Sequence, residues 1–349
     1  MKIVVNDIAA VGGGAMTVLR DFYEYVCKND HENQWFFLLN DRYFEETDNV
    51  KILTLPEVKR NPLRKLLFDF ITGRKYISAL QPDVVFSLQN IITFGLKVPQ
   101  VVYIHQSIPF QTVKRFSFFK TAERKMAVIQ YLIGAVIKRS VKKSSKVITQ
   151  THWIKEAICR QCGLPEDKVV PIVPDVMAQV QGTEEMLFDR TSFFYPTAAA
   201  IYKNNECVWQ ASAILDQERI PHKVILTLPG EQSKGNVYCV GRLPYQEVLK
   251  QYTSTTLLFP SYIETFGYPM AEARKMGGIV LASDCPFSRE VLDGYENAYF
   301  FDPFCPEELA DLMKRVIAGE IVKKDISPTN VPERNSWRDV AAQVLKAGV

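Results

Sequence analysis

Short runs of consecutive apolar residues, separated by stretches with helical periodicity, dominate the first half of the chain. Such runs span residues 2–5, 35–39, 84–87, 101–104 and 146–149. A continuous apolar run indicates a strand that is buried on both faces, as in a parallel sheet covered by helices. After the first run, apolar side chains recur at helical spacing at Met16, Val18, Leu19, Phe22 and Val26. The pattern therefore predicts a β-loop-α opening followed by further pairs of strands and helices.

The second half of the chain repeats this pattern. Its predicted strands span residues 193–195, 223–228, 236–240, 256–260, 279–283 and 299–301. Between the two sets lies a mostly polar segment, 174–189, which begins with a proline and is typical of a linker. We therefore expect an α/β protein with two Rossmann-like, doubly wound domains facing across a cleft. The predicted domains are residues 1–178 and 179–332, and a C-terminal helix within 333–349 is expected to pack back towards the first domain.

Length and composition agree with two globular domains. At about 150 residues per domain, 349 residues favour two. Forty-two Lys and Arg against 39 Asp and Glu leave a net charge of +3, which is too balanced to indicate a nucleic-acid partner. Seven scattered cysteines are typical of reduced thiols, and neither a signal peptide nor an apolar stretch near the ~20 residues of a spanning helix is apparent. The sequence thus predicts a cytoplasmic protein.

The densest candidate chemistry lies between two carboxylates, Glu264 and Glu272. A predicted strand ends at Pro260, so Glu264 is expected in a loop at the carboxyl edge of the sheet, where open α/β sheets bind ligands. A helix then begins near Pro269, and the free amides of Gly267, Tyr268 and Met270 are expected to attract a phosphate. Carboxylates beside such a site accept hydrogen bonds from vicinal hydroxyls of a sugar or ribose. Taken alone, acidic residues here are better explained by favourable interaction with the helix dipole.

Residues 259–273 resemble the signature of the retaining nucleotide-sugar enzymes of glycosyltransferase family four, which have the GT-B fold: a glutamate, seven residues and a second glutamate. The match continues through residues 273–284, 288–292, 301–303 and 306–310. The resemblance implies that Glu264 contacts hydroxyls of the donor sugar and that Glu272 holds the ribose. It also assigns Thr265, Phe266, Gly267 and Tyr268 to donor binding.

A second match lies at residues 194–205, where this family places a lysine that binds the diphosphate; here it is Lys203. A lysine at a helix start is unfavourable for the helix dipole, whereas an ammonium stabilises a departing diphosphate. The alternative is an ordinary surface lysine. The family commonly has an arginine several residues earlier, where this chain has Thr197. Gly241 and Arg242 lie in a segment resembling the loop around the nucleotide base, so Arg242 is a candidate for the missing charge or simply a surface residue.

In the first domain the candidates are Gly13, Gly14 and His105. The glycines allow backbone to approach a ligand, but Thr17 occupies the third glycine position of a dinucleotide fingerprint. The resemblance implies that Gly13 and Gly14 face the donor diphosphate and the acceptor. His105 follows the predicted strand 101–104, and the family often has a histidine there near the reaction centre. A lone histidine is otherwise commonly structural or exposed.

A local excess of positive charge lies within residues 114–146, where Glu123 is the single acidic residue. The basic residues are Lys114, Arg115, Lys120, Arg124, Lys125, Lys138, Arg139, Lys142, Lys143 and Lys146. Aromatic and aliphatic residues are interleaved with them, as in segments that lie on anionic membranes. A solvated helical face explains the same pattern equally well.

Taken together, the resemblance implies a glycosyltransferase that moves a sugar from a UDP- or GDP-linked donor to a hydroxyl of a glycan or polyprenyl-linked glycolipid, in cell-surface polysaccharide synthesis such as that of lipopolysaccharide or O-antigen. We expect no metal and no cofactor, because fixed positive groups replace the metal. The expected location is the cytoplasm or the inner face of the cytoplasmic membrane. Two alternatives stay open: a non-catalytic protein that binds nucleotide-sugar or lipid, and an NAD-dependent epimerase or oxidoreductase, which the incomplete glycine fingerprint disfavours.

Overall fold

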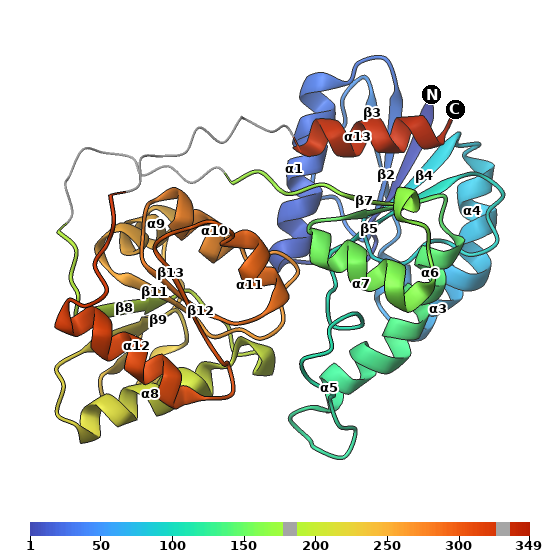
Figure 1. Cartoon of the computed structure of the whole chain (residues 1–349). Helices are drawn as coiled ribbons and strands as arrows, with labels where there is room; N and C mark the ends of the chain where they lie inside the picture. Colours follow the sequence, from blue (N-terminus) through green and yellow to red (C-terminus); the bar gives the residue numbers. More distant parts are fainter. Residues whose placement is uncertain (177–186, 326–335) are drawn as a thin grey trace. The chain divides into compact units, whose positions relative to one another are not determined.

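The computed structural model describes residues 1–176, 187–325 and 336–349, which form two compact units (Figure 1). The first unit contains Met1–Pro174 together with the C-terminal helix, and the second unit begins at Asp175. The predicted domain boundaries at 178 and 332 lie outside the described residues. Each unit consists of one parallel sheet with helices packed on it, so the expected α/β class with two Rossmann-like sheets is confirmed.

The sheet of the first unit has seven parallel strands in the order β3-β2-β1-β4-β5-β6-β7. These are β1 (Lys2–Asn6), β2 (Gln34–Leu39), β3 (Val50–Thr54), β4 (Val84–Ser87), β5 (Gln100–Ile104), β6 (Lys146–Thr149) and β7 (Val169–Pro171). The interior strand β1 aligns Val5 with Phe37 on one side and with Phe86 on the other. The edge strand β3 did not stand out in the sequence, because its buried and exposed side chains partly alternate and no continuous apolar run forms.

The helices of the first unit are α1 (Gly13–Asn29), α2 (Pro56–Lys59), α3 (Pro62–Leu67), α4 (Gly73–Ala79), α5 (Arg124–Ala127), α6 (Gly134–Lys143) and α7 (His152–Cys162). Two π-helical segments, Phe68–Thr72 and Val128–Ile133, join α3 to α4 and α5 to α6. The C-terminal helix α13 (Ser336–Ala347) lies beside α1 in Figure 1. Its Trp337 ring packs 5.5 Å from Phe22 and 6.0 Å from Tyr103, and Val340 and Val344 enter the core. The last helix of the chain therefore completes the first unit.

The second unit has six parallel strands in the order β10-β9-β8-β11-β12-β13. The strands are β8 (Ser192–Tyr195), β9 (Lys223–Leu226), β10 (Val237–Cys239), β11 (Thr256–Phe259), β12 (Val280–Ser283) and β13 (Ala298–Phe301). The helices are α8 (Asn205–Gln217), α9 (Tyr245–Ser254), α10 (Tyr268–Lys275), α11 (Pro286–Val291) and α12 (Pro306–Ala318). Strand order reverses between β8 and β11, and ligands of open α/β sheets bind at the carboxyl ends of the strands at such a point.

No helix in the described parts of the chain combines the length and the apolar character that crossing a membrane requires. The seven cysteines are all free thiols. The cysteine pair Cys159 and Cys162 lies at the end of α7, where burial raises the pKa of both thiols.

A buried polar cluster follows the carboxyl end of β1. The carboxyl group of Asp7 is 1% exposed, and neither of its oxygens has a hydrogen-bond partner among the described residues. Burial raises the pKa of Asp7 to about 7, although the Lys65 ammonium opposes this shift. Lys65 itself donates to Asp69 at 2.6 Å, and burial lowers the pKa of Lys65 despite that partner. With a pKa of about 7, Asp7 is thus largely the neutral acid at mildly acidic pH and becomes ionised as pH rises through 7.

We predict that Asp7 makes the first unit less stable as pH rises. Its folded pKa of about 7 exceeds the unfolded value of 3.8, so its contribution is complete below pH 4 and is lost as pH rises through 7. The Asp7→Asn variant should remove this loss, of which the part between pH 5 and pH 8 is at most about 3 kcal/mol at ~1.4 kcal/mol per pKa unit. Urea unfolding at pH 5 and pH 8 measures it.

The control for this measurement is Asp48→Asn, which neutralises an exposed carboxylate on the same unit. His105 contributes a slope of opposite sign, because burial lowers its pKa to about 4 and stability falls as pH drops below 6.5. The contribution of His105 is the same in both proteins, so it cancels when the free energy of unfolding of the Asp7 variant is subtracted from that of wild type. An Asp7→Asn protein whose stability changes between pH 5 and pH 8 as much as wild type does would show that Asp7 is ionised in the fold.

Candidate functional site

An ion pair joins the two loops that leave the central strands of the second sheet. The loop after β8 passes through a short 3-10 turn, Ile201–Lys203, and the loop after β11 carries Glu264. The Lys203 Nζ lies 2.6 Å from Glu264 Oε1, and the Ser261 hydroxyl donates to the same oxygen at 2.7 Å. The side chains of Lys203 and Glu264 are each less than one-fifth exposed. Both predicted residues therefore meet at the point where strand order reverses.

Backbone hydrogen bonds lock these two loops together. The Tyr202 carbonyl accepts from the Tyr262 amide at 3.0 Å. On the strand side, the buried Tyr195 hydroxyl donates to the Lys203 carbonyl at 2.8 Å. These bonds fix the backbone on both sides of the ion pair, so neither partner depends on a freely moving loop.

Asn204 holds the same region to a third strand. Its backbone is left-handed, with φ of 56°, a conformation that asparagine tolerates better than most residues. Its side-chain amide donates to the carbonyls of Pro260 at 3.2 Å and Pro303 at 2.7 Å, which follow β11 and β13. No role was assigned to Asn204 from the sequence. The tolerance of asparagine for the left-handed region was the available signal.

The charge state of Lys203 is set by competing effects. Burial lowers its pKa, but the Glu264 carboxylate and the neighbouring Tyr195 together outweigh burial, so the pKa of Lys203 lies above its usual range. The ammonium also lies 5.9 Å from the ring centres of Tyr202 and Phe259. Lys203 is thus a fixed cation at all physiological pH values, as an anion-binding group needs to be.

The start of α10 differs in detail from its prediction. The helix begins at Tyr268, after Gly267 in a left-handed conformation with φ of 94°. A Cβ on Gly267 would lie 2.6 Å from the Met270 Cε, the movable end of a flexible side chain, so it is the positive φ that favours glycine here. The Met270 amide was expected to be free for a ligand, but it donates to the Gly267 carbonyl at 3.0 Å. That expectation was wrong because Met270 already lies inside the first turn.

The residues around the start of α10 differ in how much of each side chain is exposed. The Phe266 side chain is buried, and its ring packs 5.1 Å from that of Tyr268. Tyr268 is about one-third exposed, and Thr265 is partly buried. A donor role for Phe266 would therefore rest on its backbone, whereas Thr265 and Tyr268 keep accessible side-chain surface.

Two tyrosines from α9 hold Glu272. The Tyr245 hydroxyl donates to one carboxylate oxygen at 3.0 Å, and the Tyr252 hydroxyl donates to the other at 3.1 Å. Tyr252 is fully buried, whereas Tyr245 is half exposed. Burial raises the pKa of Glu272, while the two phenol hydrogen bonds lower it. Sequence reasoning missed both tyrosines; their spacing of seven on one helix face was the available signal.

The loop expected around a nucleotide base follows β10. Gly241 has φ of 72°, and its amide donates to the Leu228 carbonyl at 2.8 Å. Arg242 is exposed and forms no ion pair with any residue that the structure describes. Thr197, which stands where the family commonly has an arginine, is held at both ends: its amide donates to Thr227 at 2.7 Å, and its hydroxyl donates to Asn205 at 2.8 Å.

The first-unit candidates lie at carboxyl ends of the other sheet. Gly13 and Gly14 open α1, behind the extended Gly12. A Cβ at Gly12 or Gly14 would meet no atom within 4 Å, so packing among the described residues does not require glycine at either position. The loop therefore leaves its backbone accessible.

His105 follows β5 and is tied to Asn90. The Asn90 Oδ1 accepts from the amides of His105 at 2.8 Å and Gln106 at 3.0 Å, so its side-chain nitrogen must donate to His105 Nε2, at 2.9 Å. This assigns the ring proton to Nδ1. Burial lowers the pKa of His105 to about 4, and the ring is therefore neutral near pH 7.

Among the residues that the structure describes, no three His, Cys, Asp or Glu side chains are grouped closely enough to hold a metal ion. The positive charge at the site comes instead from Lys203, whose partner is a carboxylate. The arrangement can bind an anion at Lys203 and hydroxyl groups at Glu264 and Glu272.

Two families match the sequence, and together they cover most of it. The family described as Glycosyltransferase Family 4 matches residues 12–174, and the one described as Glycosyl transferases group 1 matches residues 230–331. The second match contains Glu264 and Glu272. No curated protein sequence matches this chain.

Several solved structures share the fold at low sequence identity. Sucrose-phosphate synthase from Thermosynechococcus elongatus is 17% identical with a TM-score of 0.64, over 99% of this chain and 96% of the other. The lipopolysaccharide outer core galactosyltransferase WaaB is 16% identical with a TM-score of 0.64, over 99% of both chains. HepE from Anabaena, in complex with UDP-glucose, is 17% identical with a TM-score of 0.60, over 100% and 97%.

We predict that the two partners of the central ion pair depend on each other for stability. Lys203→Met leaves the Glu264 carboxylate largely buried without its cation and should lower the free energy of unfolding by about 1–3 kcal/mol. The double variant Lys203→Met/Glu264→Gln should recover part of this loss. Urea unfolding of wild type, both single variants and the double variant gives the coupling between the residues. Strictly additive effects would show that the pair does not hold the loops together.

Proposed function

Because this chain belongs to the GT-B glycosyltransferases of family four, we propose that it is a retaining enzyme that transfers a hexose from a nucleoside-diphosphate sugar. The proposed acceptor is a hydroxyl of a glycan or a polyprenyl-linked glycolipid in cell-surface polysaccharide synthesis. The observation that carries the proposal is the pairing of Lys203 with Glu264 at the strand reversal of the second sheet.

In this proposal the diphosphate of the donor binds at Lys203. The ammonium exchanges its contact with Glu264 for phosphate oxygens, and its fixed positive charge stabilises the departing nucleotide. The start of α10 at Gly267 and Tyr268 adds the positive end of a helix dipole. Glu264 is then free to accept hydrogen bonds from sugar hydroxyls, while Ser261 keeps its carboxylate in place.

Glu272 is the proposed ribose ligand. Each oxygen of its carboxylate accepts one phenol hydrogen bond and retains a further lone pair for a ribose hydroxyl. The half-exposed Tyr245 can move aside for the ribose, whereas the buried Tyr252 continues to orient the carboxylate. Gly241 and Arg242 are proposed to lie near the base.

The proposed transfer is a front-face displacement with retention. The bond between the anomeric carbon and the leaving phosphate oxygen breaks, and the acceptor oxygen bonds to the same face of that carbon. The acceptor proton passes to the leaving phosphate, so no protein base is needed. His105, neutral near pH 7, is proposed to lie near the donor sugar, and Gly13 and Gly14 to approach the diphosphate. We propose that no metal or cofactor takes part.

Two neighbours support the donor and acceptor classes. HepE was solved with UDP-glucose, and WaaB is a galactosyltransferase of the lipopolysaccharide outer core. From these we infer a UDP-linked hexose as the first donor to test, with GDP-linked donors as the alternative, and a surface glycan as acceptor.

A second candidate function rests on Thr197. This residue brings no charge to the loop after β8, and its hydrogen bonds tie that loop to Thr227, after β9, and to Asn205 at the start of α8. A protein that binds nucleotide-sugar without transferring it would fit such a site. Donor binding without product formation, tested with a panel of glycan acceptors, distinguishes this candidate from the enzyme.

We further propose that residues 114–146 touch an anionic membrane. Several of their charges are already engaged: Lys114 and Lys120 lie near Glu123, and Lys138 and Arg139 lie over aromatic rings. Exposed apolar side chains remain, with Phe119 95% and Leu132 60% exposed. These, together with the exposed cations, are the features that support peripheral binding at the inner face of the cytoplasmic membrane.

The proposed ribose contact predicts how strongly the protein binds nucleotide in the absence of metal. Titration calorimetry with UDP and with GDP, each in EDTA, should show binding of one nucleotide. Glu272→Ala should weaken that binding roughly tenfold, because one charge-assisted contact contributes about 1.5 kcal/mol. Tyr252→Phe should have a smaller effect in the same direction, since it removes only the orienting bond. Unchanged affinity in Glu272→Ala would exclude its ribose role, and Glu296→Ala is the control.

The proposed diphosphate contact predicts how fast sugar is transferred. Lys203→Ala should lower kcat of sugar transfer by 100-fold or more, because loss of a fixed group that stabilises developing charge costs about 3 kcal/mol or more. Transfer of radiolabelled sugar to acceptor measures it. Lys234→Ala, which removes an exposed lysine of the same unit, should leave kcat unchanged. A fully active Lys203→Ala enzyme would contradict the diphosphate role.

A further inference from the structure

The helical stretch from α3 to α4 exposes apolar side chains that a globular protein normally buries. Leu63 is 72% exposed, Leu66 50%, Leu67 47% and Ile71 51%. They recur at intervals of three and four residues through α3 and the π-helical turn, so they lie along one side of the stretch. Clusters of this kind mark contacts with another surface more often than isolated apolar residues do.

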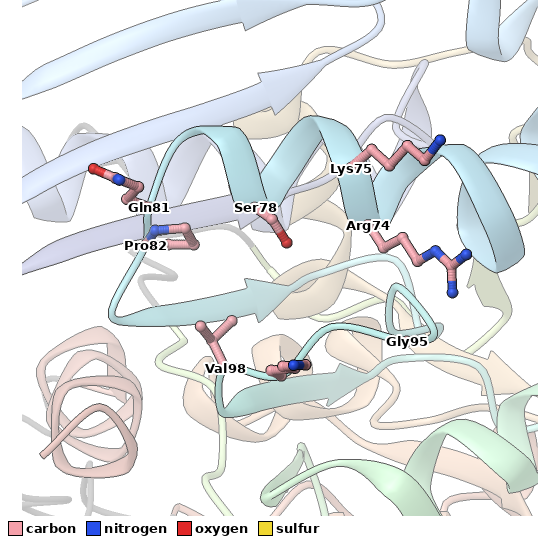
Figure 2. A pocket seen from close by; sticks show the side chains of 8 residues that line it. Arg74, Lys75, Ser78, Gln81, Pro82, Gly95 and Val98 are labelled. Atoms are coloured by element: carbon pink, nitrogen blue, oxygen red, sulfur yellow. The ribbon is translucent and has the colours of Figure 1, made fainter.

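A cationic pocket begins one turn further along the same stretch. It has a volume of about 380 Å³ and is lined by Arg74 and Lys75 of α4 and by Lys97 of the loop before β5. Figure 2 shows the Arg74 side chain extending from α4 towards the loop at Gly95. Gly95 has φ of 82°, and a Cβ there would lie 3.1 Å from the Arg74 Cδ. The glycine therefore lets the loop approach the arginine and form the pocket wall.

The charge of this pocket is not compensated. No carboxylate lines it, and none of its three cations forms an ion pair with a described residue. Elsewhere on the same stretch the cations are matched: Arg64 contacts Glu57 at 2.6 Å, and Lys65 faces the buried Asp69. Uncompensated positive charge is thus concentrated at the pocket, next to the exposed apolar residues. We call these residues together, Leu63–Ile71 and the pocket, the α3–α4 face.

We propose that the α3–α4 face docks on an anionic lipid bilayer. The pocket accepts the phosphate of a lipid headgroup at Arg74, Lys75 and Lys97, and Leu63, Leu67 and Ile71 enter the boundary between headgroups and acyl chains. An apolar stripe with adjoining cations on one helical surface is the pattern of interfacial helices. This site is separate from residues 114–146, and it does not depend on sugar transfer.

The test is sedimentation of the full chain with vesicles, without donor or acceptor. Vesicles of phosphatidylcholine with 30% phosphatidylglycerol should sediment the protein, and pure phosphatidylcholine vesicles should not. The variant Arg74→Glu/Lys75→Glu/Lys97→Glu should reduce the partition coefficient at least tenfold. Leu63→Ser/Leu67→Ser should reduce binding at 0.15 M salt while retaining part of it at low salt, because only the salt-sensitive attraction remains.

A matched control distinguishes loss of the α3–α4 face from the effect of a lower net charge on vesicle binding. Arg42→Glu/Lys234→Glu/Lys346→Glu changes net charge by the same amount at exposed positions elsewhere and should bind almost as wild type does. Circular dichroism melts check that each variant folds. Binding by the Arg74 variant equal to wild type overturns the proposal, and so does an equal loss in the control.

Further arms distinguish the other sources of binding. Reversing Lys138, Arg139, Lys142 and Lys143 to Glu tests the 114–146 segment; loss of all vesicle binding in that variant alone would overturn docking by the α3–α4 face. Calorimetry with inorganic phosphate tests a soluble ligand. Bilayer docking would also be overturned if wild type binds inorganic phosphate but not vesicles, and if the Arg74→Glu/Lys75→Glu/Lys97→Glu variant loses that phosphate binding. Nucleotide binding in EDTA is measured on the same preparations, so failure of the transfer proposal is seen separately.

Discussion

The ion pair between Lys203 and Glu264 is the interaction on which the site in the second unit depends. Strand order reverses between β8 and β11, so the loops that leave these neighbouring strands diverge, and some interaction must hold their ends together. A lysine and a carboxylate that are each less than one-fifth exposed attract strongly, because water screens them little. The pair also leaves neither charge without a partner in the second unit.

The groups around this pair hold it without taking part in binding themselves. Asn204 ties the loops after β11 and β13 to the start of α8, and Tyr252 fixes Glu272 from a fully buried position. The Asn204 amide donates to backbone carbonyls of the two loops, and the Tyr252 hydroxyl donates to the Glu272 carboxylate. Such supporting contacts fix the orientation of a functional carboxylate or lysine more closely than the loop backbone alone does.

Much of this arrangement could be predicted from the sequence. Continuous apolar runs identified most strands of both sheets, and the end of the run at Pro260 correctly located Glu264 at a carboxyl edge. The partners of these residues were missed. The spacing of Tyr245 and Tyr252 and the backbone tolerance of Asn204 are local signals, whereas their contacts join elements that only the tertiary fold brings together. The Met270 amide was misassigned since the exact first turn of α10 depends on the left-handed Gly267, which no local pattern specifies.

Bilayer docking by the α3–α4 face leaves the carboxyl edge of the first sheet accessible, because all strands of a parallel sheet end at the same edge. The chain leaves the carboxyl end of β3, passes through the short α2 and enters α3, so Leu63 and Leu67 lie towards the edge that also carries the loops at Gly13 and His105. The pocket at Arg74 and Lys97 lies further along, towards the amino ends of β4 and β5. A bilayer bound along this stretch would therefore contact the side of the unit and leave the carboxyl edge open. A lipid-linked acceptor could then reach that edge from the bilayer surface without leaving its membrane.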